Sequence, residues 1–247
     1  MNQATLEKMK HLKLHGMHRA FSTTMEAGSI SYTNDELIAY LIESEYDDRE
    51  SRKVERLITT AKFRYRAFIE EITASSSRNI DKNMIGRLST CDFISQKQNI
   101  LITGSTGVGK SFIATAIGYK ACTMGYKVMY FSINKLFSKL KMAKADGSYL
   151  KEIDRIEKQD LIILDDFGLQ SLDNLKRQDF MEIIEDRHGK RSTIIASQLP
   201  VSAWHEVIAE QTIADAILDR MVHNSLRIDL KGESLRRKKA DQKISLE

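Results

Sequence analysis

A glycine-rich segment near the middle of the chain constrains the fold more than any other feature. It reads Gly-Ser-Thr-Gly-Val-Gly-Lys-Ser from Gly104 to Ser111, the pattern G-x-x-x-x-G-K-S. The apolar run 99–103 precedes it, and a helical pattern over 112–124 follows it. A strand, a glycine loop and a helix in this order predict a cradle whose backbone N–H groups bind phosphate. The alternative is a plain glycine-rich turn that caps the helix.

The phosphate-cradle reading assigns a role to each polar group of the loop. The Lys110 ammonium can reach the β- and γ-phosphates, and the Ser111 hydroxyl can ligate Mg²⁺. We therefore expect ATP and Mg²⁺ as cofactors. The residues expected to contact the nucleotide are Gly104, Ser105, Thr106, Gly107, Val108, Gly109, Lys110, Ser111 and Phe112.

A second motif, Leu-Ile-Ile-Leu-Asp-Asp over 161–166, follows at a suitable distance. An apolar run without alternation predicts a central parallel strand that is buried on both faces. At its carboxyl end, Asp165 is placed to hold Mg²⁺ beside the loop, and Asp166 to act as general base toward a water. The second acid favours ATP hydrolysis over phosphoryl transfer to a small metabolite. The alternative is a strand followed by an Asp-rich turn.

Composition sets wide bounds on the chain. Its 247 residues suit one large domain, or a domain with an appendage. A net charge of +4 permits a nucleic-acid partner without requiring one. Cys91 and Cys122 form neither a metal-ligand spacing nor a disulfide framework, so we expect reduced, structural thiols and a cytosolic location. The start has no apolar signal core, and no apolar run approaches the ~18 residues of a membrane helix.

The pattern divides the chain into two parts. Apolar residues at helical spacing predict a helical N-terminal domain over 1–75, in which Thr33 and Glu36 resemble a capping box. The remainder, 76–247, alternates strand and helix, which predicts an α/β domain with a parallel sheet. The expected strands are 98–103, 127–132, 160–165, 192–197 and 225–230, and the run 75–79 is the expected hinge.

Three further positions carry candidate chemistry. Ser197 and Gln198 end a buried strand, at the edge where α/β sheets bind ligands, or they only cap the next helix. Arg220, near the end of a helical pattern, suits the γ-phosphate of a neighbouring subunit, or pairs with Asp219 or a glutamate. Arg236 follows the last strand and suits the phosphates in cis, or belongs to an ordinary basic tail.

Basic residues gather in three places that suit the phosphates of a nucleic acid, and the third, the C-terminal run 236–239, is equally typical of an ordinary basic tail. The alternative reading of each is a solvated surface, because charge runs commonly face water. Such cations bind the backbone without reading bases. The candidates are Lys135, Lys139, Lys141 and Lys144 in one helix, and Lys62, Arg64 and Arg66 after the N-terminal helices.

Together these motifs resemble the IstB family of AAA+ ATPases, which are encoded beside transposases and are related to DnaC and DnaA. The more specific blocks are Ser-Gln-Leu-Pro followed by Trp-His-Glu, from Ser197 to Glu206, and Ala-Asp-Ala-Ile-Leu-Asp-Arg, 214–220. The resemblance implies an AAA+ core with a five-stranded parallel sheet, a small helical N-terminal domain and a reduced C-terminal lid. It also implies that Gln198, with Ser197, stands at the first sensor, Arg220 at the trans-acting arginine and Arg236 at the second sensor. One departure is the absence of a proline near Arg66.

The family further implies a bacterial cytoplasmic ATP hydrolase, stimulated by DNA and by oligomerisation. It would form homo-oligomers with ATP at subunit interfaces, bind duplex DNA with little sequence preference and assist a cognate transposase in insertion-sequence transposition, with no membrane partner. Two alternatives remain open. One is a DnaC-like loader of a replicative helicase, and the other is a small-molecule kinase with the same phosphate loop, which the Asp165–Asp166 pair disfavours.

Overall fold

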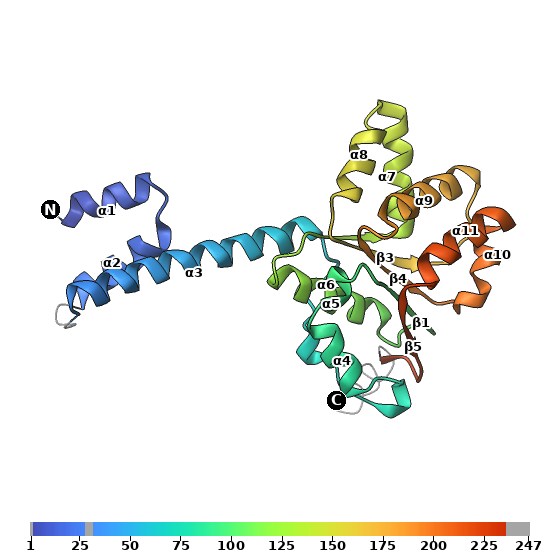
Figure 1. Cartoon of the computed structure of the whole chain (residues 1–247), viewed down its shortest axis with the longest axis horizontal. Helices are drawn as coiled ribbons and strands as arrows, with labels where there is room; N and C mark the ends of the chain where they lie inside the picture. The colour runs from blue at the N-terminus through green and yellow to red at the C-terminus, as the bar shows by residue number, and fades with distance from the viewer. Residues whose placement is uncertain (1, 28–31, 236–247) are drawn as a thin grey trace, which may run out of the picture. The chain divides into compact units, whose positions relative to one another are not determined.

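The computed structural model describes residues 2–27 and 32–235 (Figure 1). The chain divides into two compact units, Met1–Arg56 and Leu57–Glu247. Helix α3, Asn34–Ala61, contains the boundary between them. The segment expected as a hinge, 75–79, lies inside the second unit, where Ser76–Arg78 form the short 3-10 helix η2.

The first unit is a helical hairpin built from α2, His15–Glu26, and α3, preceded by α1, Asn2–His11. The two helices are in close contact at Gly16. A Cβ atom there would overlap the carbonyl oxygen of Ser44 and lie 2.7 Å from the Cα of Glu45. Glycine is therefore required at this position for the hairpin to pack.

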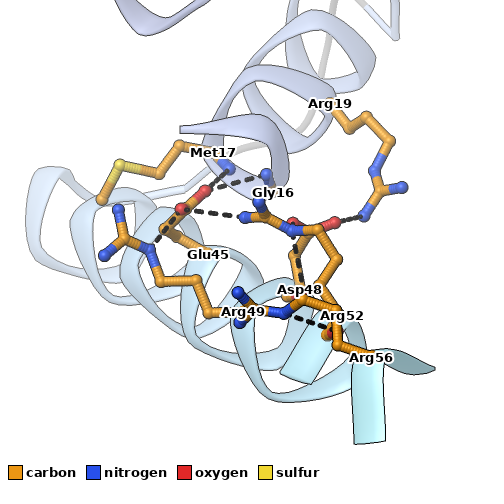
Figure 2. Close-up of polar contacts among 8 residues, drawn as sticks. All are labelled: Gly16, Met17, Arg19, Glu45, Asp48, Arg49, Arg52 and Arg56. Carbon is orange, nitrogen blue, oxygen red and sulfur yellow. Dashed lines mark hydrogen bonds and ion pairs between the residues drawn. The ribbon is translucent and has the colours of Figure 1, made fainter. Parts of the chain in front are cut away.

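Glu45 of α3 caps the N-terminus of α2 (Figure 2). Its Oε2 accepts hydrogen bonds from the N–H groups of Gly16, at 2.8 Å, and Met17, at 3.3 Å. The N-cap residue itself, Leu14, contributes no side-chain bond. A carboxylate at this end of a helix satisfies orphan N–H groups and complements the helix dipole.

The arginines of the hairpin are largely neutralised by acids within the same unit, as Figure 2 shows. Arg49 Nε lies 2.6 Å from Glu45 Oε1, and Arg52 Nε lies 2.6 Å from Asp48 Oδ2. Arg19 also pairs with Asp48.

The capping box at the start of α3 is confirmed, because Glu36 Oε2 accepts from the Thr33 N–H at 2.8 Å and Thr33 Oγ1 accepts from the Glu36 N–H at 3.3 Å.

A parallel sheet with the strand order β2-β3-β4-β1-β5 forms the centre of the second unit. The strands are β1 Asn99–Gly104, β2 Val128–Ser132, β3 Leu161–Phe167, β4 Ser192–Ser197 and β5 Ser225–Leu230. Each expected strand is confirmed within one or two residues of its predicted bounds. Because all strands run the same way, their carboxyl ends meet at one edge, where the glycine loop follows β1.

Helices cover both faces of the sheet. One apolar cluster joins Ile102 and Ile163 to α6, Lys110–Thr123, and the other joins Leu101 and Ile162 to helices on the opposite face. Alternate strand residues enter opposite clusters, as the pleat requires. The other helices are α4 Lys82–Ser89, α5 Asp92–Ser95, α7 Ile133–Asp146, α8 Tyr149–Glu157, α9 Asn174–Arg187, α10 Trp204–Ile208 and α11 Gln211–Val222, with 3-10 turns η1 Ile69–Glu71 and η3 Val201–Ala203.

Both cysteines are free and fully buried in the first of these clusters. Burial raises the pKa of the Cys91 thiol to about 11 and that of Cys122 to about 12. Both therefore remain neutral core side chains at ordinary pH. In the part of the chain that the structure describes, no helix combines the length and apolarity that a membrane crossing requires.

Candidate active site

The glycine loop lies between β1 and α6 and is shaped by left-handed backbone. Gly104, Gly107 and Gly109 have φ values of 142°, 82° and 101°. Side-chain-bearing residues rarely adopt these values, so the glycines are needed for the curve of the loop. Gly109 is the N-cap of α6 and carries no side chain over the N-terminal end of that helix, the end at which a helix favours an anion.

Lys110 is folded into the curve of the loop. Its Nζ donates to the carbonyl oxygens of Gly104 and Ser105, each at 2.8 Å, and the residue is only 8% exposed. An ammonium group held at the centre of a loop of N–H groups is suited to polyphosphate. Phe112, in the first turn of α6, stacks on Tyr65, with ring centroids 6.3 Å apart.

The structure brings Asp165 to the loop through Ser111. Ser111 Oγ donates to Asp165 Oδ1 at 3.0 Å, and the N–H of Asp166 donates to the same oxygen at 2.9 Å. The hydroxyl of Tyr130 donates to the other carboxylate oxygen, Oδ2, at 2.5 Å. Burial, together with the Asp165 carboxylate, raises the Tyr130 pKa far above its usual range, so this phenol stays a donor.

A hydroxyl and a carboxylate side by side are hard oxygen ligands, the donor set that Mg²⁺ prefers. The residues present therefore fit a magnesium nucleotide. Among residues 2–27 and 32–235, there is no group of three or more His, Cys, Asp or Glu side chains that could hold a metal by itself. Any divalent ion would thus need phosphate or water oxygens to complete its coordination.

Asp166 points to a different surface from Asp165. The register between β3 and β4 shifts between Leu164 and Phe167, and Asp166 has φ +62° within this irregularity. Such a bulge redirects a side chain. The Asp166 carboxylate lines a cleft of about 630 Å³, where it lies 4.0 Å from the Arg64 guanidinium.

Gln198 is joined to the phosphate loop, whereas Ser197 is not. Thr106 Oγ1 donates to Gln198 Oε1 at 2.7 Å, which links the carboxyl end of β4 to the loop after β1. Ser197 is fully buried, and its Oγ donates to the Phe167 carbonyl at 2.9 Å and accepts from the Leu199 N–H at 3.1 Å. The hydrogen bonds of the Ser197 hydroxyl are therefore made to backbone groups near the end of β4.

Arg220 pairs with Glu185 of α9, at 3.2 Å, and donates to the carbonyl of Ala216 at 2.9 Å. Within a single chain, Arg220 is therefore paired with a glutamate, which is one of the alternatives that the sequence left open. Arg236 lies outside the described residues. The segment just before it does reach the loop, because the Leu235 N–H donates to the Gly107 carbonyl at 3.0 Å.

Sequence reasoning missed two residues of the site. Tyr130 lies in an apolar run, where an aromatic residue is typical of a core, and only the pairing of β2 with β3 places it against Asp165. Arg78 lies in the serine-rich run expected as a hinge, yet its Nη2 donates to the Val108 carbonyl in the phosphate loop at 2.7 Å. No local signal marks either contact, because each joins segments far apart in sequence.

The predicted basic residues separate into two groups. Lys62, Arg64, Lys135 and Lys139 line the same cleft as Asp166 and Tyr130, together with Arg155. Lys139 and Arg155 share the carboxylate of Glu152, so the cleft keeps an excess of positive charge. The residues that do not line it are Arg66, Lys141 and Lys144, and Lys144 pairs instead with Asp179.

Comparison with known proteins finds the same family along nearly the whole chain. A family model described as IstB-like ATP binding protein matches residues 7–243. A Sinorhizobium fredii protein named as an insertion sequence ATP-binding protein, y4pL, is 45% identical over 234 residues, covering 94% of this chain and 96% of that protein. The protein of Pseudomonas fluorescens named as an ATP-binding protein of insertion sequence IS1162 is 39% identical over 206 residues, covering 82% and 88%.

Solved structures share the fold at low identity. The DnaC helicase loader superposes with a TM-score of 0.58 and 20% identity, covering 69% of this chain and 100% of that one. AMPPCP-bound DnaA from Aquifex aeolicus gives 0.59 and 18%, covering 74% and 56%. With the five-stranded parallel sheet and the helical N-terminal part, these likenesses confirm the fold class expected from the sequence.

Proposed function

The chain belongs to the family of IstB-like ATP-binding proteins, and we propose that it is an ATP hydrolase of the AAA+ class that assembles on duplex DNA and assists a partner transposase in insertion-sequence transposition. One observation carries this proposal. The second unit combines a phosphate loop, linked through Ser111 to Asp165, with a basic cleft that opens beside Asp166. A loop suited to nucleotide phosphates and a cleft suited to a polyanion thus share neighbouring residues, Asp165 and Asp166.

The nucleotide half of the proposal assigns roles to residues around the loop. Lys110 and the loop N–H groups would bind the phosphates, and Ser111 and Asp165 would hold Mg²⁺. The bound ion would neutralise charge on the phosphate oxygens. Asp166 would accept the proton of the attacking water. Gln198, fixed by its bond to Thr106, would orient that water, and Arg236 would bind the phosphates in cis.

In this proposal, a second subunit supplies the remaining positive charge at the interface between subunits. Arg220 would leave Glu185 and reach the γ-phosphate bound by the next subunit, where a guanidinium fork suits developing phosphate charge. The Arg220–Glu185 pair is compatible with such a rearrangement, because it lies at the surface, where the Arg220 side chain is 25% exposed and that of Glu185 57%, and ion pairs open to solvent are weak. ATP bound at this interface would favour assembly, since it contacts both subunits only in the assembled state.

The DNA half of the proposal rests on the basic cleft. Lys62, Arg64 and Lys135 come from separate segments, the loop after α3 and helix α7, and converge on one hollow. Cations arranged in this way bind a phosphodiester backbone without reading sequence, and the binding weakens as salt rises. In contrast, three arginines of the first unit, Arg19, Arg49 and Arg52, are paired with Glu45 or Asp48, which disfavours them as the main phosphate contacts.

The experiment that tests this function is sedimentation of the purified chain with ATP and Mg²⁺, with and without a random-sequence duplex. Assemblies that need both ATP and duplex are expected. Lys135→Gln should weaken duplex binding and reduce its salt dependence, whereas Lys141→Gln, outside the cleft, serves as the matched control. A chain that binds ATP but stays monomeric with duplex would contradict the proposal. That result would favour a loader that needs its protein partner, the alternative that the DnaC-like fold supports.

A further inference from the structure

Two residues that line the basic cleft contact the aspartates beside the phosphate loop. The sequence pattern predicts neither contact. Arg64, in the loop after α3, lies 4.0 Å from the Asp166 carboxylate. Tyr130 lines the same cleft and donates to Asp165. Each of the two neighbouring carboxylates is therefore reached from the basic cleft.

Asp165 and Asp166 have different surroundings. Asp165 is 1% exposed and bonded to Ser111 of the phosphate loop. The bulge in β3 turns Asp166 toward the cleft, where its side chain is 32% exposed and faces the guanidinium of Arg64. In this arrangement the carboxylate proposed to accept a proton from water, that of Asp166, lies in the basic cleft.

We propose that Arg64 is a latch, which holds Asp166 in the cleft until a phosphodiester group of a nucleic-acid strand binds Arg64 and releases the carboxylate toward the nucleotide. This inference rests on the proposed function and specifies how its two sites communicate. Polynucleotide binding and ATP hydrolysis would then be coupled through one side chain. Arg64 acts here as a positioning residue.

The energetics suit a reversible latch. The Arg64 side chain is 57% exposed, and ion pairs at such exposure are weak, so a single phosphate contact is enough to exchange partners. A guanidinium binds phosphate through two parallel N–H groups, which favours the exchange. Two other cations of the cleft, Lys62 and Lys135, would hold the strand while Arg64 changes partner.

The decisive measurement is the rate of ATP hydrolysis without DNA, compared between the wild-type chain and Arg64→Gln. Loss of the guanidinium should raise this DNA-free rate about fivefold, the factor that corresponds to about 1 kcal/mol. Stimulation by a random-sequence duplex should shrink by the same factor. Arg64→Lys keeps a cation beside Asp166 and should restore the low DNA-free rate.

Arg87→Gln provides the matched control, because Arg87 is an exposed arginine of α4 outside the cleft. Circular dichroism should show that all variants fold. A DNA-free rate of Arg64→Gln equal to or below that of the wild type would overturn the latch. Anisotropy of a labelled duplex separates the two proposals. A wild-type chain that fails to bind duplex overturns the proposed function, whereas the DNA-free rate of Arg64→Gln still decides whether Arg64 restrains Asp166.

Discussion

The Tyr130 hydroxyl donates a 2.5 Å hydrogen bond to Oδ2 of Asp165, so that both oxygens of this buried carboxylate have protein donors. Tyr130 comes from β2 and Asp165 from β3, and the two strands pair in parallel register. The phenol therefore fixes the orientation of the carboxylate from the side opposite Ser111. A carboxylate that is held in this way needs little reorganisation when it binds a cation.

Tyr130→Phe should lower ATP turnover about tenfold while nucleotide affinity without Mg²⁺ stays unchanged. The substitution leaves one buried carboxylate oxygen without its donor, at a cost of ~1–3 kcal/mol, and frees Asp165 to rotate. A titration of kcat against Mg²⁺ should show a higher half-saturating concentration. Tyr149→Phe is the matched control, since Tyr149 also donates to carboxylates, those of Asp179 and Glu182. Equal effects of both substitutions would contradict the assignment.

Asp166→Asn should reduce turnover by a factor of ~10²–10⁴ without loss of ATP binding, because the amide cannot accept the proton from water. If hydrolysis releases the assembly from DNA, this variant should stay on the duplex as oligomers. The measurement is the lifetime of the DNA-bound species after dilution, followed by light scattering. Wild-type dissociation rates in this variant would show that release does not depend on hydrolysis.

Arg220→Ala should bind ATP normally and lose turnover, because its arginine would complete the site of a neighbouring subunit. Mixing it with Lys110→Ala offers a sharp test. In mixed assemblies, the intact loop of the first variant meets the intact Arg220 of the second, and part of the activity should return. Glu185→Ala frees Arg220 from its partner and should leave turnover intact. Rapid hydrolysis by monomeric Arg220→Ala would refute the proposal that Arg220 completes the ATP site of a neighbouring subunit.

Acid should loosen the α2–α3 hairpin through Glu45. Burial alone would raise the pKa of this carboxyl, but the Arg49 guanidinium and the N–H groups of Met17 and Gly16 outweigh burial, and its pKa is lowered. A group whose pKa is lower in the folded state stabilises the fold above its ordinary pKa of 4.5 and loses that contribution as pH falls through the lowered value. The protection of the α2 amides from hydrogen exchange, relative to the intrinsic exchange rate at each pH, should therefore fall below about pH 4.5.

Glu45→Gln should remove most of this pH dependence and destabilise the hairpin by ~1–2 kcal/mol at neutral pH, because an amide caps the helix without a charge. Glu43→Gln, at an exposed position of the same helix, is the control. An unchanged exchange profile in Glu45→Gln would show that the cap does not limit opening of α2.

The parts of the site that could be predicted from the sequence are those whose residues lie together in one short, continuous segment. The glycine loop carries its own conformational requirement, and the apolar run before Asp165 defines a buried strand. The side of a strand on which a polar residue lies is harder to predict when both faces are buried. For this reason the pattern placed Ser197 beside Gln198 as a ligand contact, whereas the Ser197 hydroxyl bonds the backbone.

The sequence pattern does not predict contacts between segments that are far apart in the chain. Arg64 and Asp166 meet only because the loop after α3 packs beside the end of β3, and a bulge, which periodicity does not reveal, turns the carboxylate toward it. Likewise, the sequence groups four lysines of α7 as candidate phosphate contacts, but Lys144 pairs with Asp179, whose position depends on tertiary packing. Spacing along a helix predicts a shared face and says nothing of the acids that come to cover it.

The cap that Glu45 provides for α2 has a consequence for synthesis of the chain. Gly16 and Glu45 are separated by 29 positions, and the N-cap residue Leu14 offers no substitute. At translation rates of ~5–20 residues per second, the nascent α2 waits roughly 1.5–6 s before its cap is made. During that interval the α2 segment lacks its N-terminal cap, so the hairpin must form after the polypeptide has grown through the middle of α3.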